Sequence, residues 1–167
     1  MKAYKVLRAD GRGVFTAFRW PLPAARPGEW VRSEPKPCRS GIHACRPSHL
    51  PLWIGRSLYE IELDGEIVDD AMKVVASQGR LVRRIDAWDE QAYDAYTRMC
   101  ADRAHELARG HGLDNWEAVI EPSVPEGGAL LGFVAARIAE ELDGVEGYHR
   151  ERATQAEWLA ERLQLSS

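Results

Sequence analysis

The sequence predicts an α+β fold, in which an antiparallel or mixed sheet in the N-terminal half is packed by about three C-terminal helices. Residues 1–88 hold short runs of β-branched and aromatic residues between glycine, proline and aspartate, which is typical of strands and turns. Residues 89–167 place apolar residues three to four positions apart, as amphipathic helices do. Because no helices separate the predicted strands, a parallel α/β sheet is disfavoured. The length of 167 residues suits one domain, which we expect over residues 1–167.

The first two predicted strands flank a glycine-containing turn. Residues 3–7 form the first strand, residues 10–13 form the turn, and residues 14–20 alternate as the second strand, which together predict a hairpin. Residues 21–37 hold five of the nine prolines. We therefore expect extended loop there, with at most a brief strand at residues 29–31.

The remainder of the N-terminal half is predicted to continue as a meander. Pro47 can start a helical turn over residues 47–54, and Pro51 limits its length. The pair Asp64-Gly65 is a strong turn signal between two strands. The remaining predicted strands cover residues 41–45, 57–63, 66–69, 72–76 and 79–85.

Three helices account for the C-terminal half. Asp89 is the predicted N-cap of a helix that ends at Gly110. Residues 112–128 contain two prolines and two adjacent glycines, so they predict a connector, with a short strand at residues 116–120. The second predicted helix covers residues 130–142 and is ended by Gly144. The third covers residues 146–163.

The composition excludes several classes of protein. The net charge is −4 and the pI is near 5.8, so no overall positive field attracts nucleic acid, and we do not expect a nucleic-acid partner. No run of about 18 apolar residues is present, so we expect no membrane association. The N-terminus lacks a signal-peptide pattern, and the three cysteines do not form a secreted disulfide framework. We therefore expect a cytoplasmic protein.

The segment 38–46 is the first candidate for a functional site, because a glycine turn leads there into a short apolar strand. Cys38, His43, Cys45 and His49 are possible zinc ligands, but their spacing differs from the paired cysteines of structural zinc sites, so no metal is predicted. A second hypothesis is nucleophilic catalysis by Cys38 or Cys45 with His43 as base, although a spacing of two on one strand keeps parallel side chains apart. A buried structural strand with apolar thiols is the alternative to both.

Arginines in the N-terminal half suggest a third hypothesis, the binding of phosphate or carboxylate. The planar guanidinium group suits anions that offer two oxygens. Surface arginines that merely keep a strand edge soluble are the alternative interpretation. The residues that would converge, if the first two strands neighbour residues 41–45, are Arg8, Arg12, Arg19, Arg39 and Arg46.

The order of motifs in residues 2–86 resembles an uncharacterised family of small phage and bacterial proteins. Residues 4–6 (YKV) and a glycine turn precede residues 38–45 (CRSGIHAC), and a strand ending in a glycine turn precedes residues 73–76 (KVVA). The shared mark of that family is a C-x-x-G-[FI]-H-A-C motif followed by these two features. The family has no assigned activity, so the resemblance implies a domain and a bacterial or phage source, without a function.

The same half is distantly similar to ADP-ribosyltransferase-like folds. In those folds an opening strand with an aromatic-basic pair and a later strand flank an NAD cleft. Tyr4 and Lys5 match the pair, and residues 41–44 (GIHA) match the later strand. Lys5 and Glu62 stand in for the usual opening arginine or histidine and the late catalytic glutamate. The resemblance thus implies NAD as a cofactor, although the chain departs from the family at both of these positions.

Together these observations predict a protein that binds a small anionic or nucleotide-like ligand in a cleft near His43, as a binding protein or a transferase-like enzyme. His43 would supply a polar contact or act as the catalytic acid or base. The alternative function is a non-catalytic interaction module, in which the helices of residues 89–167 dock a partner protein or form a homodimer. The predicted ligand-binding residues are Tyr4, Lys5, Arg39, Arg46 and Trp53.

Overall fold

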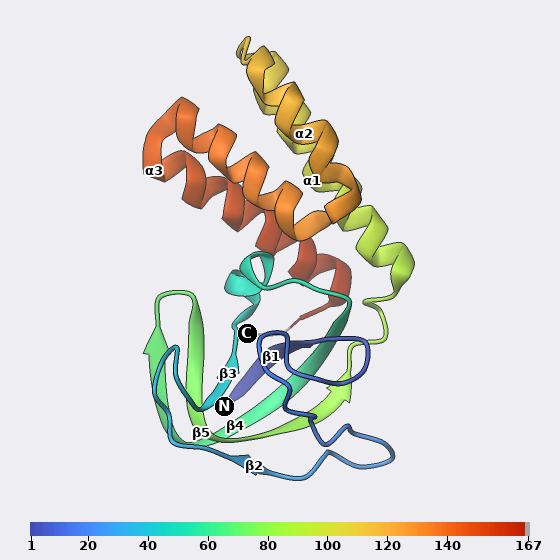
Figure 1. The fold of residues 1–167 in the computed structure, drawn as a ribbon, viewed down its shortest axis with the longest axis vertical. Coiled ribbons are helices and arrows are strands. Elements are labelled where there is room, and N and C mark those ends of the chain that lie inside the picture. The colour runs from blue at the N-terminus through green and yellow to red at the C-terminus, as the bar shows by residue number, and fades with distance from the viewer. Residues whose placement is uncertain (166–167) are drawn as a thin grey trace.

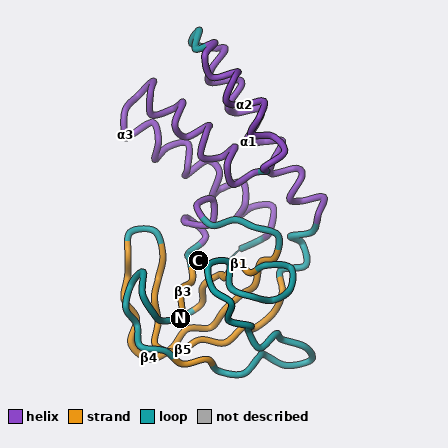
Figure 2. Tube along the Cα trace, viewed as in Figure 1, coloured by secondary structure: helices purple, strands orange, loops and turns teal. Residues whose placement is uncertain are grey.

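The computed structural model describes residues 1–165, and it shows a curved sheet with helices stacked at one end (Figure 1). All strands come from the N-terminal half and the long helices from the C-terminal half. Figure 2, coloured by element type, shows the strands and the long helices in separate parts of the molecule. The α+β prediction is confirmed. Within the described residues, none of the helices combines the length and apolar character that crossing a membrane would require.

The sheet has five antiparallel strands. Its order is β1-β4-β5-β2, and β3 also pairs with β5. The long strands β4 and β5 form the central hairpin, and β2 and β3 pair with different stretches of β5. The strands are β1 (Lys2–Leu7), β2 (Val31–Arg32), β3 (Ile42–Ala44), β4 (Ser57–Asp70) and β5 (Lys73–Arg84).

One backbone pair closes the sheet on itself. Tyr4 of β1 and Cys45, directly after β3, exchange two backbone hydrogen bonds of 2.8 Å each. Because β1 also pairs with β4, β4 with β5, and β5 with β3, this contact completes a circuit of four strands. A hydrophobic cluster that includes Ile61, Leu63 and Leu81 is buried among these strands. The position of β3 beside β1 is therefore set by long-range pairing.

The central hairpin is longer than the sequence predicts. The four strands predicted between residues 57 and 85 are two continuous strands, β4 and β5. Gly65 lies inside β4 with a φ of 75°, where the register against β5 shifts. The Asp64-Gly65 signal therefore marks a bulge, which uses the same left-handed glycine conformation as a turn. The chain reverses instead at Ala71 and Met72.

The prediction of a second strand at residues 14–20 is wrong. This segment is an irregular loop that folds back on the turn before it, with an isolated bridge between Arg19 and Arg12. The turn itself touches the first strand through another bridge, between Gly13 and Leu7. Among the described residues no strand pairs with residues 14–20, and the Phe15 side chain is 81% exposed. The alternation of apolar residues therefore does not reflect one buried and one solvated face, which is what the pattern assumes.

The first helix, α1 (Glu90–Gly110), begins where the sequence predicts. A side-chain oxygen of Asp89 accepts a hydrogen bond of 2.8 Å from the backbone N–H of Ala92, which caps the helix. One residue earlier, the buried Trp88 donates from Nε1 to the carbonyl of Gly55 at 2.7 Å. This bond attaches the start of α1 to the segment before β4.

The helix α3 (Gly128–Leu163) contains both of the other predicted helices. Asp143 and Gly144 have non-helical backbone angles and separate two arms, and Gly144 has a φ of 65°. The arms approach closely at Gly147, where an added Cβ would lie 2.1 Å from the carbonyl oxygen of Ala139. Both glycines are therefore required, one for the turn of the backbone and one for the close approach.

The connector between α1 and α3 is helical. It contains the 3₁₀ turns η2 (Asp114–Trp116) and η3 (Val124–Glu126) on either side of the short helix α2 (Glu117–Ser123). The predicted strand at residues 116–120 is therefore wrong. Ile120 is instead fully buried in the hydrophobic cluster to which α1 and α3 also contribute, and α2 packs against both of these helices.

A second hydrophobic cluster joins the helices to the end of the sheet. The apolar faces of α1 and α3 pack there with Tyr4, Leu58 and Trp88, which are all buried. The 3₁₀ helix η1 (Pro47–Leu52), which is the predicted helical turn, lies against α3 and contributes Leu50 to this cluster. The helices thus support the segment that connects β3 to β4.

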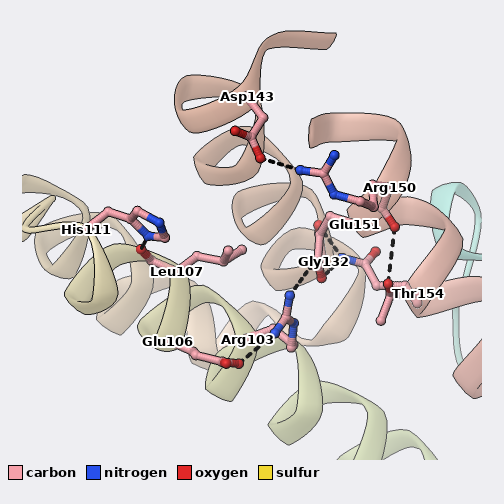
Figure 3. Close-up of polar contacts among 10 residues, drawn as sticks. Arg103, Glu106, Leu107, His111, Gly132, Asp143, Arg150, Glu151 and Thr154 are labelled. Atoms are coloured by element: carbon pink, nitrogen blue, oxygen red, sulfur yellow. Dashed lines mark hydrogen bonds and ion pairs between the residues drawn. The ribbon is translucent and has the colours of Figure 1, made fainter. Parts of the chain in front are cut away.

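A buried polar network ties α1 to both arms of α3 (Figure 3). Glu151, only 3% exposed, accepts from Arg103 Nη2 at 3.0 Å and from Gln155 Nε2 at 3.1 Å. Gln155 Nε2 also donates to the carbonyl of Gly132 on the other arm at 3.0 Å. Arg103 bonds in addition to Glu106, which is exposed. The carboxylate of Glu151 therefore has its charge balanced inside the helical layer.

The substitution Glu151→Gln should lower the free energy of unfolding by about 2 kcal/mol, because Arg103 would lose its buried partner and keep only the solvated one. The matched substitution Glu106→Gln, on the exposed side of the same arginine, should cost less than about 1 kcal/mol. Urea denaturation of the three proteins measures both values. Equal losses for the two variants would contradict this account.

Candidate ligand-binding cavity

A cavity of about 1070 Å³ opens between β1, β3 and the loop of residues 13–18. Its walls are formed by residues that are far apart in the chain. They belong to β1, to the segment between β2 and β3, to β3 and to the end of η1. Its polar and aromatic lining residues are Tyr4, Lys5, Phe15, Thr16, Phe18, Trp20, Arg32, Ser33, Cys38, Arg39, Ser40, His43, Trp53 and Lys73.

The cavity exists because β1 and β3 separate beyond their one backbone pair. In an antiparallel ladder that continued from Tyr4 and Cys45, the next pair to exchange backbone hydrogen bonds would be Val6 and His43, but this pair does not form. The carbonyl oxygen of His43 instead accepts a hydrogen bond of 2.6 Å from Lys5 Nζ. The amine of Lys5 therefore bridges the gap where the backbone pairing stops.

A glycine allows the approach to β3. Gly41 has a φ of 104°, a conformation that L side chains rarely adopt. An added Cβ would lie 2.6 Å from Val75 Cγ1 and 3.0 Å from Pro35 Cα. The glycine turn of the CRSGIHAC segment thus lets the chain pass tightly between β5 and the preceding loop before it enters the cavity wall.

Lys5 is a poorly hydrated amine with no acidic partner. Within residues 1–165 no carboxylate forms an ion pair with Nζ, which lies 4.5 Å from the centroid of the Trp20 ring. Loss of hydration on burial lowers the pKa of Lys5 from 10.5 to about 8, and the nearby Cys45 thiol opposes this only in part. A substantial fraction of the amine is therefore neutral slightly above physiological pH.

His43 is also held in its neutral form. Its pKa lies below the ordinary value of 6.5, chiefly because partial burial disfavours the imidazolium. The charges of Lys5 and Lys73 lower the pKa further, and Asp70 opposes them. Among the described residues, no hydrogen-bond partner reaches the buried Nε2 atom. The imidazole can therefore donate to or accept from a ligand.

Further cations line the wall, with no acidic residue among the lining residues. Lys73 Nζ lies 3.1 Å from Cys38 Sγ and 3.5 Å from Oδ2 of Asp70, which is not a lining residue. The hydrogen bond to Cys38 is the main cause that raises the pKa of Lys73. Arg32 and Arg39 complete the basic set with Lys5 and Lys73. This one-sided charge favours an anion in the cavity.

Aromatic side chains form the apolar part of the wall. Trp53 is fixed by a hydrogen bond of 2.8 Å from Nε1 to the carbonyl of Met72, and the Phe15 ring meets it edge to face at 6.1 Å. Phe18 and Trp20 form a second edge-to-face pair at 5.6 Å. Rings arranged in this way offer flat surfaces to a planar ligand.

The structure brings together most of the residues that the sequence predicts for the site. Tyr4, Lys5, Arg39, His43 and Trp53 all line the cavity, and Tyr4 forms part of its buried wall.

Arg46 lies outside the lining. Its guanidinium forms a bidentate pair with Asp69, with N–O distances of 2.7 and 2.5 Å. The arginines at positions 8, 12 and 19 do not line the cavity either. The cations that do so therefore differ from the predicted arginine set.

The arrangement of the thiols argues against Cys45 as the nucleophile and against a shared zinc site. Cys45 is 3% exposed, and burial raises its pKa to about 12, so it stays protonated and is a poor nucleophile. Cys38, His43, Cys45 and His49 do not bring their ligand atoms within reach of one ion. In the described part of the chain, three such ligand atoms lie within 4.8 Å of one another at His105, Glu117 and Glu121 instead.

Sequence reasoning missed Trp20, Phe15 and Lys73 as lining residues. The chain contains six tryptophans, but no local pattern singles out Trp20 as a cavity residue. Lys73 is part of the KVVA motif, yet its approach to Cys38 depends on how β5 lies beside the loop before β3. Contacts between residues 35 positions apart leave no local signal.

No family model, curated protein or solved structure matches this chain. The resemblance to a phage and bacterial family and the one to ADP-ribosyltransferase-like folds therefore stay predictions. Glu62, which stands in for a catalytic glutamate in the second resemblance, pairs with Arg80 at 2.7 Å and does not line the cavity.

The depressed pKa of Lys5 should make stability depend on pH. Burial disfavours the ammonium of Lys5 in the folded protein, so its contribution to stability is complete above its unfolded pKa near 10.5 and is lost as pH falls through its folded pKa of about 8. Wild type therefore gains stability as pH rises over this range, and the variant Lys5→Met does not. Its stability relative to wild type should therefore fall by up to about 3 kcal/mol between pH 7 and pH 10.5. Urea denaturation at several pH values measures the difference, and a difference that stays constant with pH would refute this assignment.

Proposed function

We propose that this protein binds a small ligand that combines a planar ring with an anionic group, as a nucleotide does. The observation that carries the proposal is the lining of the cavity, which contains Lys5, Arg32, Arg39 and Lys73 without any acidic residue among the lining side chains. An anion placed there meets several cations and no like charge. The aromatic residues provide surfaces for the planar ring.

The Lys5 amine is the centre of this anion site. In the free protein its charged form is disfavoured by lost hydration and has no carboxylate to compensate. A phosphate or carboxylate beside Nζ would stabilise the ammonium, so binding should raise the pKa of Lys5 and take up protons near pH 8. A charge-assisted hydrogen bond of this kind contributes about 1.5–3 kcal/mol.

The size of the cavity agrees with a ligand of this class. Its volume of about 1070 Å³ is slightly above the roughly 300–1000 Å³ typical of small-molecule sites, so a nucleotide-sized ligand would fit. The cavity is lined by two aromatic pairs, Phe15 with Trp53 and Phe18 with Trp20, and we propose that the ring of the ligand packs against one of them. The neutral imidazole of His43 would then supply a directional hydrogen bond.

The proposal concerns binding and does not include glutamate-dependent transfer of ADP-ribose. Such a reaction needs a carboxylate at the ligand, and Glu62 is engaged with Arg80 away from the lining. Within the same ligand class, NAD remains a candidate because it carries both a planar ring and phosphates. The basic and aromatic wall supports binding of that chemistry.

Isothermal titration calorimetry with four probes tests the proposal. Adenosine 5′-monophosphate should bind more tightly than adenosine, ribose 5-phosphate or inorganic phosphate, because only the first compound engages both the rings and the cations. The variant Lys5→Met should lose about tenfold or more in affinity for the monophosphate. Binding measured in buffers of different ionisation enthalpy should report proton uptake near pH 8.

The matched control is Arg46→Ala, which removes a cation on the same segment but outside the cavity. It should bind the monophosphate as wild type does. Absence of binding by wild type, or equal affinity for the monophosphate and adenosine, would refute the proposed site.

The helical half is the basis of a second candidate function, the docking of a partner protein or of a second copy of the chain. The observation that favours it is a set of exposed apolar side chains on the connector and on α3. Light scattering should then show a mass above 18.8 kDa that falls when Phe133 is replaced by Ser. A monomer at all concentrations would rule out the homodimer. The set comprises Val119, Val124, Leu130, Phe133 and Val145.

A further inference from the structure

We propose that the Lys5 amine captures carbonyl compounds covalently, forming an imine with an aldehyde that also carries an anionic group. The inference rests on the proposed ligand site and adds a chemical step to it. The geometry that supports it is the position of Nζ in the cavity wall, held by the carbonyl of His43 at 2.6 Å and facing the Trp20 ring at 4.5 Å.

The surroundings of Lys5 favour an amine that acts as a nucleophile. The hydrogen bond to the His43 carbonyl uses one N–H of the amine and leaves the nitrogen lone pair of its neutral form free. Among the described residues, no carboxylate pairs with Nζ to hold it as an ammonium. An apolar, poorly hydrated pocket is the environment in which lysines form Schiff bases. The lowered pKa of about 8 agrees with this geometry.

Lys5 is distinct from the other lysines of the chain. There are four lysines in all, and the other three each form an ion pair: Lys2 with Glu60, Lys36 with Glu34 and Lys73 with Asp70. An ion pair stabilises the charged ammonium, which has no lone pair with which to attack a carbonyl carbon. An aldehyde should therefore react with Lys5 in preference to the three lysines that form ion pairs.

The reaction is a condensation that needs no oxidant or reductant. The neutral amine attacks the carbonyl carbon, a C–N bond forms, and one proton moves from nitrogen to the former carbonyl oxygen to give a carbinolamine. A second proton then reaches that oxygen, and the C–O bond breaks as the nitrogen lone pair forms the C=N bond, so that water leaves. The proton that remains on nitrogen is released to give the imine, and no net proton is consumed. The titratable groups around Lys5 are Cys45, which burial keeps protonated, and His43, which can carry protons in these steps.

The class of carbonyl compound follows from the rest of the wall. In a compound whose carbonyl group occupies the place at Lys5 Nζ, Arg39 and Lys73 would hold the anionic group instead of Lys5, and the rings of Trp20 and Trp53 would pack against a planar body. An aromatic aldehyde with a phosphate or carboxylate substituent combines these features. The carbonyl group would then lie at Lys5, at the deep end of the wall where β1 and β3 separate.

The test uses pyridoxal 5′-phosphate as the aldehyde probe and borohydride to reduce any imine to a stable secondary amine. Peptide mapping by mass spectrometry separates the adduct on Lys5 from adducts on the α-amino group and on Lys2, Lys36 and Lys73. At pH 7.5 we expect about tenfold or more labelling of Lys5 over each of the other lysines, since its neutral fraction exceeds that of an ordinary lysine. Labelling of Lys5 should reach half its maximum near pH 8.

Two controls separate this inference from the proposed binding site. Pyridoxine 5′-phosphate has the same ring and phosphate without the aldehyde, so it should bind by calorimetry and protect Lys5 from labelling. The variant Lys5→Arg cannot form the imine, so it should give no adduct at position 5, whereas Lys2, Lys36 and Lys73 should be labelled as weakly as in wild type.

Three results would overturn the inference. If pyridoxine phosphate binds and Lys5 forms no adduct, covalent capture is refuted and the proposed binding function stands. Equal labelling of all four lysines refutes a selective reaction at Lys5, and hence a specific site for the aldehyde in the cavity. If neither phosphate compound binds and Lys5 is not labelled, both the inference and the anion site that it rests on are refuted.

Discussion

The hydrogen bond from the Lys5 amine to the carbonyl of His43 is the contact on which the cavity depends. β1 and β3 share only one backbone pair, at Tyr4 and Cys45, and beyond it the strands separate. The amine satisfies a carbonyl oxygen that a longer ladder would have paired. The same contact places a cation in a poorly hydrated wall without an acidic partner. The gap between the two strands and the buried charge in the cavity wall therefore depend on the same side chain, Lys5. An anionic ligand beside it would offset the cost of burying that charge.

The two halves of the molecule contribute differently to this site. Ala129 is the single lining residue that the described α-helices provide, so the sheet half supplies the chemistry. The helices act through η1, which packs on α3 and is held by a 3.4 Å hydrogen bond from Arg152 to the carbonyl of Pro51. Trp53 follows η1 directly. The buried network at Glu151 thereby stabilises the helices that hold an aromatic wall of the cavity in place.

The three cysteines show how burial decides reactivity. Cys45 and Cys100 lie in the hydrophobic cluster, and burial raises the pKa of each thiol to about 12. Cys38 is exposed, lines the cavity and accepts a hydrogen bond from Lys73. Thiols with the same sequence neighbourhood, at positions 38 and 45, thus have opposite environments. This difference explains why the C-x4-H-x-C spacing does not predict a shared metal or a catalytic pair.

Local sequence determined most of the element types, apart from residues 14–20 and 116–120, because periodicity, capping and backbone freedom act over a few residues. The Asp89 cap, the break at Gly144 and the strand-rich first half could all be predicted in this way. Five predicted site residues also meet at the cavity, since the CRSGIHAC segment and the first strand were both recognisable.

Only the tertiary structure decided which cations share the cavity and which side chains pair elsewhere. Arg46 is bound to Asp69, Lys73 and Trp20 join the wall, and Gly65 forms a bulge inside a continuous strand. Each of these outcomes depends on pairing across many residues. Hydration and charge at a side chain are set by neighbours in space, and strand register places those neighbours.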